Sequence, residues 1–193
     1  MVKKIRCSWC LSDPLYIKYH DEEWGVPVHD DRKLFEFLIL ESAQAGLNWL
    51  TILKKREGYR QAFCDFDAQK VANLSDQDIQ KLIENETIIR HAGKIRSAIN
   101  NAQAFLKIQE SFGSFDAYSW SFAKKRSTPP RKDIADLPKT TDQSDLLSKD
   151  LKKRGFQFVG STMIYGYMQA VGMVNDHLVS CFRYQDCVHR EIF

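Results

Sequence analysis

Hydrophobic residues recur along this chain with a helical period. In the segment 31–46 the apolar positions lie three and four residues apart, and they include Leu34, Phe37, Leu38 and Ala45. The segment 87–108 repeats this spacing, which is typical of helices that bury one face. The stretch "FQFVG" at 156–160 alternates, but it is too short to pair alone as a strand. The pattern therefore predicts an all-α fold of about eight to ten helices.

Residues at the ends of these segments support the assignment. Ser75 precedes the periodic run "DQDIQKLI" and has a side chain suited to a helix N-cap. Gly155 follows the run 143–154 and can end a helix there. Residues 124–143 contain three prolines among serine, threonine and aspartate residues, which predicts a long irregular connection of the kind that is often functional. Because no internal repeat interrupts the chain, we expect a single domain over residues 1–193.

Composition narrows the class of protein. The 193 residues are 44% hydrophobic and 27% charged, as in ordinary globular domains with a sizeable core. No apolar run approaches the roughly 18 residues of a membrane span, and the basic start lacks the apolar stretch of a secretory signal. Five cysteines, an odd number, favour a reducing cytosol over a disulfide framework. The net charge of +3 permits a nucleic-acid partner without requiring one.

Cysteine and histidine residues near the two ends of the chain are candidate metal ligands. They are Cys7, Cys10 and His20 at the start, and His177, Cys181, Cys187 and His189 at the end. On a helix, His177 and Cys181 would share a face and could occupy two corners of a metal tetrahedron. A site shared by both ends would tie the termini together and stabilise the domain. Spacing alone leaves open the alternative that these residues are unrelated.

Glu41 is the unusual residue of the segment 31–46. At about 100° per residue it falls on the apolar face, where an unpaired carboxylate costs several kcal/mol. The neighbouring Arg32, Lys33 and Glu36 point elsewhere and can face water. One interpretation of Glu41 is a buried salt bridge or a cap for a neighbouring loop. The other is a pocket carboxylate that recognises a ligand with hydrogen-bond donors or positive charge.

Aromatic residues are dense around Glu41 in the sequence. They are Trp9, Tyr16, Tyr19, Trp24 and Trp49. Each ring taken singly can belong to the core. Together with a carboxylate, however, flat amphipathic rings suit a cationic planar ligand, because stacking and cation–π attraction add affinity while the carboxylate adds direction. The combination favours the pocket interpretation.

The segment 151–172 predicts two helices joined by a tight hairpin. Gly160 allows close approach of the backbone, and Ser161 can cap the second helix. Backbone N–H groups at the start of that helix would form an anion site. Basic residues nearby would suit a DNA backbone: Lys152, Lys153 and Arg154 before the hairpin, and Arg90, Lys94 and Arg96 on another helix. The alternative is a simple helical hairpin with a solvated basic end.

Five segments together resemble a known family. They are "DPLYIKYHDEEWGVP" (13–27), "LESAQAGLNWLTILKKRE" (40–57), "IIRHAGKI" (88–95), "LSKDLKKRGFQFVG" (147–160) and "MVNDHLVSC" (173–181). The chain is similar to the bacterial 3-methyladenine DNA glycosylase I family, within the helix-hairpin-helix DNA glycosylases. The resemblance implies an all-α repair enzyme that flips 3-methyladenine out of double-stranded DNA and hydrolyses its N-glycosidic bond. The tail after Arg183 matches no motif of the family.

The resemblance also implies a set of site residues. One structural zinc would be held by Cys7, His20, His177 and Cys181, so that residues 1–25 and 173–185 form the zinc-binding part. The base pocket would comprise the catalytic Glu41 with Trp49, Tyr16, Tyr19, Trp24 and Trp9. DNA would meet Gly46 and Leu47, the latter beside the gap left by the flipped nucleotide. It would also meet Lys153, Phe158, Val159, Gly160 and Ser161 in the helix-hairpin-helix, residues 147–172. Phe158 stands where many superfamily hairpins have a glycine, and Cys10 and Cys187 have no counterpart role.

Asn175 departs from the superfamily pattern. Many members carry a catalytic aspartate in a "V-D-x-H" motif, whereas this chain has Asn175 in that position and Asp176 one residue later. On a helix, Asp176 would point about 100° away from the direction of position 175, so it could not simply replace the catalytic aspartate. The resemblance therefore implies a monofunctional hydrolase, because a cationic base can leave as a neutral molecule without an acid.

The partners implied are methylated DNA and the free base as product. The resemblance further implies a monomer that acts in the bacterial cytoplasm at the nucleoid, with no membrane. Two other functions remain open at this point. One is a non-catalytic, zinc-stabilised module that binds DNA damage, and the other is a zinc-stabilised protein-interaction domain in which Glu41 and the aromatic rings form core.

Overall fold

The computed structural model describes residues 4–123 and 129–188, and this part of the chain is helical. It contains ten α-helices and three short 3-10 helices, and no strand beyond one isolated bridge between Arg131 and Leu178. The predicted all-α fold is confirmed. None of the helices in these two ranges is both long enough and apolar enough to cross a membrane. The candidate ligand His189 lies outside the described residues, as do positions 124–128 of the predicted connection.

Most of the elements follow one another with short connections, and longer ones precede α8 and α10. In chain order they are η1 (Ser8–Cys10), α1 (Pro14–Glu22), α2 (Asp31–Gln44), α3 (Trp49–Ala62), η2 (Cys64–Phe66), α4 (Ala68–Ala72), α5 (Asp76–Glu84), α6 (Ala92–Phe112), α7 (Phe115–Trp120), η3 (Ile134–Asp136), α8 (Asp142–Lys153), α9 (Ser161–Ala170) and α10 (Arg183–Val188). Residues 129–141 before α8 are irregular as predicted, apart from the single turn η3, and α8 begins at Asp142, so that the connection ends two residues earlier than predicted.

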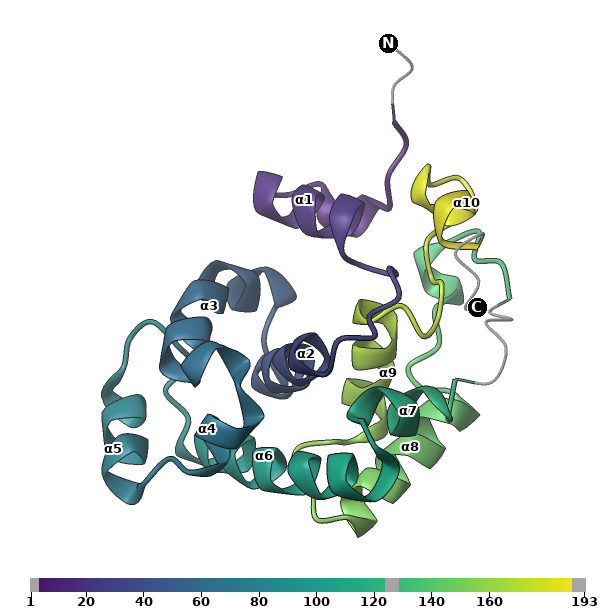
Figure 1. Ribbon diagram of the computed structural model, residues 1–193. Coiled ribbons are helices and arrows are strands. Elements are labelled where there is room, and N and C mark those ends of the chain that lie inside the picture. The colour runs from purple at the N-terminus through teal and green to yellow at the C-terminus, as the bar shows by residue number, and fades with distance from the viewer. Residues whose placement is uncertain (1–3, 124–128, 189–193) are drawn as a thin grey trace.

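Helix α2 lies at the centre of the molecule. It contacts α3, α6, α7 and α9, and Figure 1 shows α3 on one side of it and α9 on the other. Every residue from Leu34 to Ala43 is buried, so α2 is enclosed on all sides and not only along one apolar stripe. A helix enclosed in this way has little freedom to shift. It can therefore hold a side chain such as Glu41 in one place.

Several predicted helix boundaries are confirmed and two are wrong. Ser75 caps α5 in a reciprocal capping box with Asp78, and Gly155 follows α8 with a φ of +90°. Helix α6 begins at Ala92 and not within 87–91, because the His91 side chain caps it by accepting from Lys94 N at 3.2 Å. Gly160, and not Ser161, is the N-cap of α9.

The two ends of the described chain lie together. In Figure 1 the N-terminal segment and α1 stand beside α10, and the backbone N–H of Phe182 donates to the carbonyl of Ile5 at 2.9 Å. The carbonyl of Gln169 in α9 accepts from Gly25, and Val28 donates to Val171. These bonds fasten the segment after α1 to the end of α9, so α1 is held above α2 from both directions.

A buried ion-pair network joins α1, α2 and α3. Arg56 of α3 donates twice to Glu23, at 2.8 Å each, and its Nε donates to Glu36 at 2.7 Å. Glu36 was expected to face water, but its side chain is only 3% exposed and Lys33 also pairs with it. Burial opposes ionisation of Glu36, yet the hydrogen bond and charge of Arg56 outweigh it and lower the pKa. The network fixes three helices that surround the space below α1.

Replacement of Arg56 by methionine should destabilise the fold strongly. The substitution removes the guanidinium that bonds both Glu36 and Glu23 and leaves Lys33 as the nearest cation to the buried Glu36. A buried charge that loses its partner completely costs about 3–5 kcal/mol, so the loss here should approach that range from below. Chemical denaturation at pH 7 measures the change. Arg60→Met, one turn further along the same helix, removes a longer and more exposed contact with Glu36, 3.4 Å against 2.7 Å for Arg56, and it should have a much smaller effect. Equal stability of Arg56→Met and the parent protein would show that the network contributes nothing to the fold.

Candidate functional site

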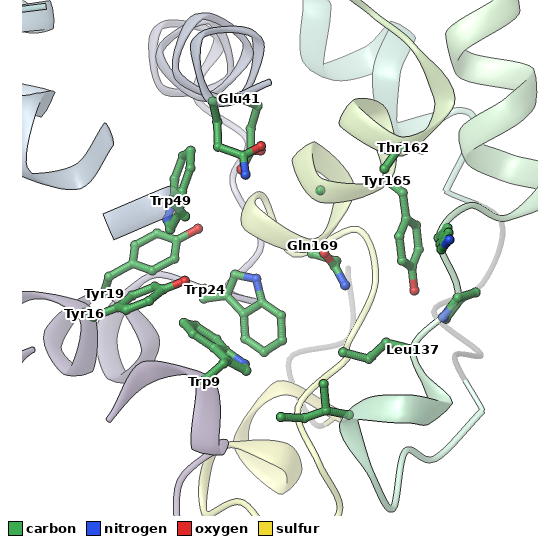
Figure 2. A pocket seen from close by; sticks show the side chains of 15 residues that line it. Trp9, Tyr16, Tyr19, Trp24, Glu41, Trp49, Leu137, Thr162, Tyr165 and Gln169 are labelled. Atoms are coloured by element: carbon green, nitrogen blue, oxygen red, sulfur yellow. The ribbon is translucent and has the colours of Figure 1, made fainter. Parts of the chain in front are cut away.

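A cavity of about 430 Å³ opens between α1, α2, α3 and α9. Four parts of the chain line it: Trp9, Tyr16, Tyr19 and Trp24 from the N-terminal part; Glu41, Gln44 and Trp49 from α2 and α3; Ile134, Leu137, Pro138 and Lys139 from the connection before α8; and Thr162, Tyr165, Gly166 and Gln169 from α9. Figure 2 shows these side chains around one space. All six residues expected to form a base pocket are among them.

Two walls of the cavity were not anticipated from the sequence. Tyr165 and Gln169 are four residues apart, so they share one face of α9, a spacing that could have been noticed. In the sequence, the length of the connection that carries Leu137 and Pro138 was the only indication that it belongs to a functional site. Both walls arise from chain segments distant in sequence from the aromatic cluster, and only the packing of α9 on α2 places them there.

Glu41 projects from α2 into this cavity (Figure 2). Glu41 is only 6% exposed, and no hydrogen bond or ion pair to its carboxylate occurs within residues 4–123 and 129–188. The interpretation of Glu41 as a salt bridge or loop cap is therefore not supported. Burial raises its pKa from an ordinary value of 4.5 to about 8. The carboxylate oxygens of Glu41 are therefore available to accept hydrogen bonds from a ligand.

Gly166 allows α9 to approach the Glu41 carboxylate. A Cβ atom at this position would lie 3.1 Å from Oε2 of Glu41, closer than side chains ordinarily pack. Glycine inside a helix is otherwise unfavourable by about 1 kcal/mol relative to alanine. The close approach therefore gives a reason for glycine here, because a larger residue would displace the carboxylate.

The aromatic residues form a continuous wall opposite α9. Trp9 packs against Tyr16 and Trp24 with ring centroids 4.8 and 4.9 Å apart, and Tyr19 packs against Trp49 at 5.5 Å. Burial, with a smaller contribution from Glu41, raises the pKa of Tyr19. Its hydroxyl therefore remains protonated and can donate a hydrogen bond. The wall offers flat apolar surfaces with hydroxyl and indole groups at their edges.

Behind this wall lies a cluster of four buried metal-binding side chains. Cys7, His20, His177 and Cys181 each offer one ligand atom, and these atoms lie within 4.8 Å of one another. Cys181 Sγ is 3.5 Å from His20 Nε2 and 3.6 Å from His177 Nδ1. The hydrogen bond with Cys7 lowers the pKa of Cys181 most, burial opposes it, and the two imidazoles lower it further. The cluster can hold a tetrahedral metal ion.

Hydrogen bonds around the cluster orient both imidazole rings. Asp21 accepts from Nδ1 of His20 at 2.8 Å and is itself held by Arg6, while the carbonyl of Trp24 accepts from Nε2 of His177 at 3.1 Å. Because each acceptor takes the ring N–H, the opposite nitrogen presents its lone pair to the cluster. This arrangement is typical of metal-binding histidines.

The expected helix through His177 and Cys181 is wrong, although the two side chains do meet. The backbone from 173 to 182 forms turns, and Cys181 N donates to the carbonyl of Leu178 at 2.8 Å. A tight turn thus replaces the helical spacing. Cys10 and Cys187 are buried outside the cluster, and the Cys10 thiol donates to the carbonyl of Cys7 at 3.1 Å.

The cluster also supports the cavity directly. The Trp24 ring lies edge-on to His177 with centroids 4.6 Å apart, and Trp9 lies edge-on to His20 at 5.3 Å. Two rings of the cavity wall therefore rest on the two histidines. A disturbance of the cluster would be transmitted to the pocket.

The expected DNA-contacting residues lie at two exposed turns. Gly46, with a φ of +81°, and Leu47, 39% exposed, form the turn between α2 and α3. Phe158 is 42% exposed and has a φ of +54°, so this residue adopts the backbone conformation that glycine usually supplies in such hairpins. Lys153 is exposed nearby.

Val159 of the hairpin and Lys94 of α6 are less available for contact with DNA than expected. The Val159 side chain is buried, and its carbonyl accepts from Ser148 Oγ at 2.6 Å, so only its N–H can face a ligand. Lys94 donates to the carbonyls of Ala43 and Ala45 at 2.8 and 2.6 Å. It therefore binds the C-terminal end of α2 instead of presenting a free charge.

Comparison with known proteins agrees with the geometry. A family model for methyladenine glycosylases matches residues 9–184. The chain belongs to this family. It is 49% identical over 180 residues to DNA-3-methyladenine glycosylase 1 of Escherichia coli (strain K12), covering 93% of this chain and 96% of that protein.

Solved structures of the family superpose closely on the fold. A crystal structure of 3-methyladenine DNA glycosylase I matches with a TM-score of 0.89 at 49% identity, covering 92% of this chain and 98% of the other. A second, a variant glycosylase in complex with 3-methyladenine, matches with a TM-score of 0.88 at 39% identity, covering 92% and 96%. The all-α architecture is thus that of the methyladenine glycosylases.

In this member of the family Asn175 supports the metal cluster. Its Nδ2 donates to the carbonyl of Tyr184 at 3.1 Å, and its Oδ1 accepts from His177 N at 3.3 Å. The helical rotation expected between Asn175 and Asp176 is wrong, because this backbone is not helical. Neither residue lines the cavity, although Asp176 is bonded to residues that do.

The raised pKa of Glu41 predicts a pH dependence of stability. The unfolded chain ionises this residue near pH 4.5, whereas the folded chain keeps it protonated up to about pH 8. The stabilisation is therefore complete below pH 4.5 and is lost as pH rises through 8, by at most about 1.4 kcal/mol per pH unit. Glu41→Gln should remove this slope, so the variant gains stability relative to the parent as pH increases.

Urea denaturation of both proteins between pH 5 and 9 measures the difference. Asp13→Asn alters the half-buried carboxylate that caps α1, whose pKa is lowered by its hydrogen bond with Lys54. It serves as the control and should show no trend between pH 5 and 9, because Asp13 is ionised in both states there. A constant difference between Glu41→Gln and the parent across this range would contradict an uncompensated Glu41.

Proposed function

We propose that this protein removes 3-methyladenine from alkylated double-stranded DNA by hydrolysing the N-glycosidic bond. The observation that carries the proposal is the buried, unpartnered Glu41 carboxylate at the edge of an aromatic cavity. A relative of 39% identity has been solved with 3-methyladenine bound, which supports the same ligand class here. A base within a duplex cannot reach such a cavity, so the nucleotide must be flipped out.

Glu41 would orient the base by hydrogen bonds and would favour its positive charge. Methylation at N3 gives the base in DNA a positive charge, and a carboxylate that lacks protein donors can accept N–H groups of the base and favour the cation. Trp49 would stack on the ring, while Tyr16 and Tyr19 add shape and hydrogen bonds, with Trp9 and Trp24 behind them. Because the base leaves as a neutral molecule, the departure needs no general acid.

The exposed turn between α2 and α3 and the hairpin between α8 and α9 would contact the DNA. Leu47, beside Gly46, would occupy the gap left by the flipped nucleotide. At the start of α9 no side chain caps the helix, so the N–H groups near Gly160 and Ser161 are available for a phosphate. Phe158, the N–H of Val159 and the charge of Lys153 would complete the hairpin contact. Phosphate contacts of this kind position a protein on DNA without reading sequence.

The absence of a carboxylate at position 175 favours a hydrolase without strand-cleaving activity. A lyase needs an amine nucleophile, and "STMIYGYMQ" after the hairpin contains no lysine. Asn175 is engaged with His177 and Tyr184 and does not line the cavity. The enzyme would thus leave an intact abasic site. We also propose that it acts as a monomer in the reducing bacterial cytoplasm, at the nucleoid.

We further propose that the metal at the Cys7, His20, His177 and Cys181 cluster is zinc. Tetrahedral Zn–S and Zn–N bonds place sulfur and nitrogen ligands about 3.5 Å apart, and Cys181 lies 3.5 Å from His20 and 3.6 Å from His177, while Cys7 lies 3.8 Å from His177. Four protein ligands leave no position for substrate, so the ion would be structural. It would hold the two ends of the chain together behind the aromatic wall.

Base release tests the function. We expect duplex DNA treated with a methylating agent to release 3-methyladenine, detected by chromatography, and borohydride to trap no enzyme–DNA adduct. Glu41→Gln should slow release at least tenfold, since a charge-assisted hydrogen bond contributes about 1.5–3 kcal/mol. The parent rate should rise with pH toward 8 as Glu41 ionises. Binding of damaged DNA without base release would instead support a non-catalytic damage-binding module.

Metal analysis tests the zinc proposal. The purified protein should contain one zinc per chain, and Asp21→Ala should weaken zinc binding roughly 10- to 100-fold because His20 loses the acceptor that orients it. Cys10→Ser, beside the cluster but outside it, should leave the stoichiometry unchanged. Loss of zinc in Cys10→Ser with retention in Cys181→Ser would contradict this ligand set.

A further inference from the structure

Asp176 lies behind the α9 wall of the cavity, where it accepts hydrogen bonds from three side chains. Gln169 Nε2 donates to it at 2.8 Å, Arg131 Nε donates at 3.1 Å, and the Tyr165 hydroxyl also donates to it. The Asp176 side chain is fully buried, and that of Arg131 is 13% exposed. A buried carboxylate with this set of donors is well satisfied.

This arrangement determines which polar atoms α9 presents to the cavity. An ionised carboxylate can only accept, so the Gln169 amide must turn its nitrogen toward Asp176. Its carbonyl oxygen Oε1 is then the atom left over, and no donor is paired with Oε1 anywhere in residues 4–123 and 129–188. The Tyr165 hydrogen is likewise directed to Asp176. Gln169 and Tyr165 both line the cavity and face the same space in Figure 2.

Adenine and guanine differ at the group such a wall would meet. Adenine carries an exocyclic amino group that donates, whereas guanine carries a carbonyl oxygen that accepts. An oxygen fixed at Gln169 can pair with the first and repels the second. A free glutamine would not discriminate, because its amide can rotate to present either atom.

We propose that Gln169 is a specificity-determining residue and Asp176 the positioning residue that fixes its amide. Together they select 3-methyladenine over 3-methylguanine. The inference rests on the proposed excision of 3-methyladenine and adds to it the discrimination between two methylated purines. Arg131 completes the arrangement, because its guanidinium holds the Asp176 carboxylate in place from the side of the connection before α8.

The selectivity ratio tests the proposal. Release of 3-methyladenine and 3-methylguanine from the same methylated DNA is measured for the parent, Gln169→Met and Asp176→Asn. Gln169→Met removes the acceptor at similar volume, so the ratio of the two rates should fall on the order of tenfold, mainly through slower 3-methyladenine release. Asp176→Asn can donate as well as accept, so the Gln169 amide can turn over, and the ratio should fall through faster 3-methylguanine release.

Gln103→Met is the matched control, since Gln103 donates to the carbonyl of Ala72 on the exposed side of α6. Both of its rates should equal those of the parent. A merely structural role for Gln169 would lower both rates together and leave the ratio unchanged, and that result would overturn the proposal. Asp176 adjoins His177, so zinc content and thermal stability of Asp176→Asn are recorded, and Gln169→Met decides the outcome if that variant is unstable.

Calorimetric binding of the two free bases separates this inference from the proposed function. A parent protein that prefers free 3-methyladenine, with the preference reduced in Gln169→Met, supports the inference even where excision is slow. A parent protein that releases 3-methyladenine but binds both bases equally well would overturn the inference and leave the proposed function intact. Absence of both release and binding of 3-methyladenine would overturn the two together.

Discussion

The Glu41 carboxylate is enclosed by protein yet bonded to none of the described residues, and much of the fold serves to hold it so. An isolated carboxylate is expensive to bury, and its pKa of about 8 reflects that cost. Enclosed α2 prevents the side chain from escaping to water, and Gly166 brings α9 close enough to exclude solvent from one side. Stability is thereby reduced at a site where a donor-bearing ligand can restore it, as is common in binding sites.

The cluster of two cysteines and two histidines and the ion-pair network together hold in place an aromatic wall that comes from a short terminal segment. The residues from Trp9 to Trp24 contribute four rings to the cavity but belong to a part of the chain with one short α-helix. Arg56 joins the end of α1 to α2 and α3, and the contacts of Cys7 and His20 with His177 and Cys181 join the N-terminal part to the C-terminal turn. Both the Arg56 network and the cluster lie outside the cavity, so they can hold the rings rigid without enclosing the faces that a bound base would contact.

Local patterns predicted much of this site because its chemistry is concentrated in short stretches. Glu41 stood out as a charge on an apolar stripe, and the nearby rings were evident by density. Family resemblance selected the four Cys and His residues that the structure brings together, which spacing alone left ambiguous. Non-local contacts explain the failures. Glu36 was expected in water because its partner Arg56 lies on another helix, His177 and Cys181 meet through a turn and not a helix, and Gln169 reaches the cavity only through the packing of α9.

Direct titration of Glu41 tests the central claim, that its carboxylate is kept unpaired for a ligand. Carbon-13 NMR of protein labelled at glutamate side chains, with Glu41→Gln used to assign the resonance, gives the pKa of this one group. The account predicts a value near 8 in the free protein and a clear decrease when 3-methyladenine is bound, because the N–H groups of the base favour the ionised form. A value near 4.5 in the free protein, unchanged by the ligand, would contradict it.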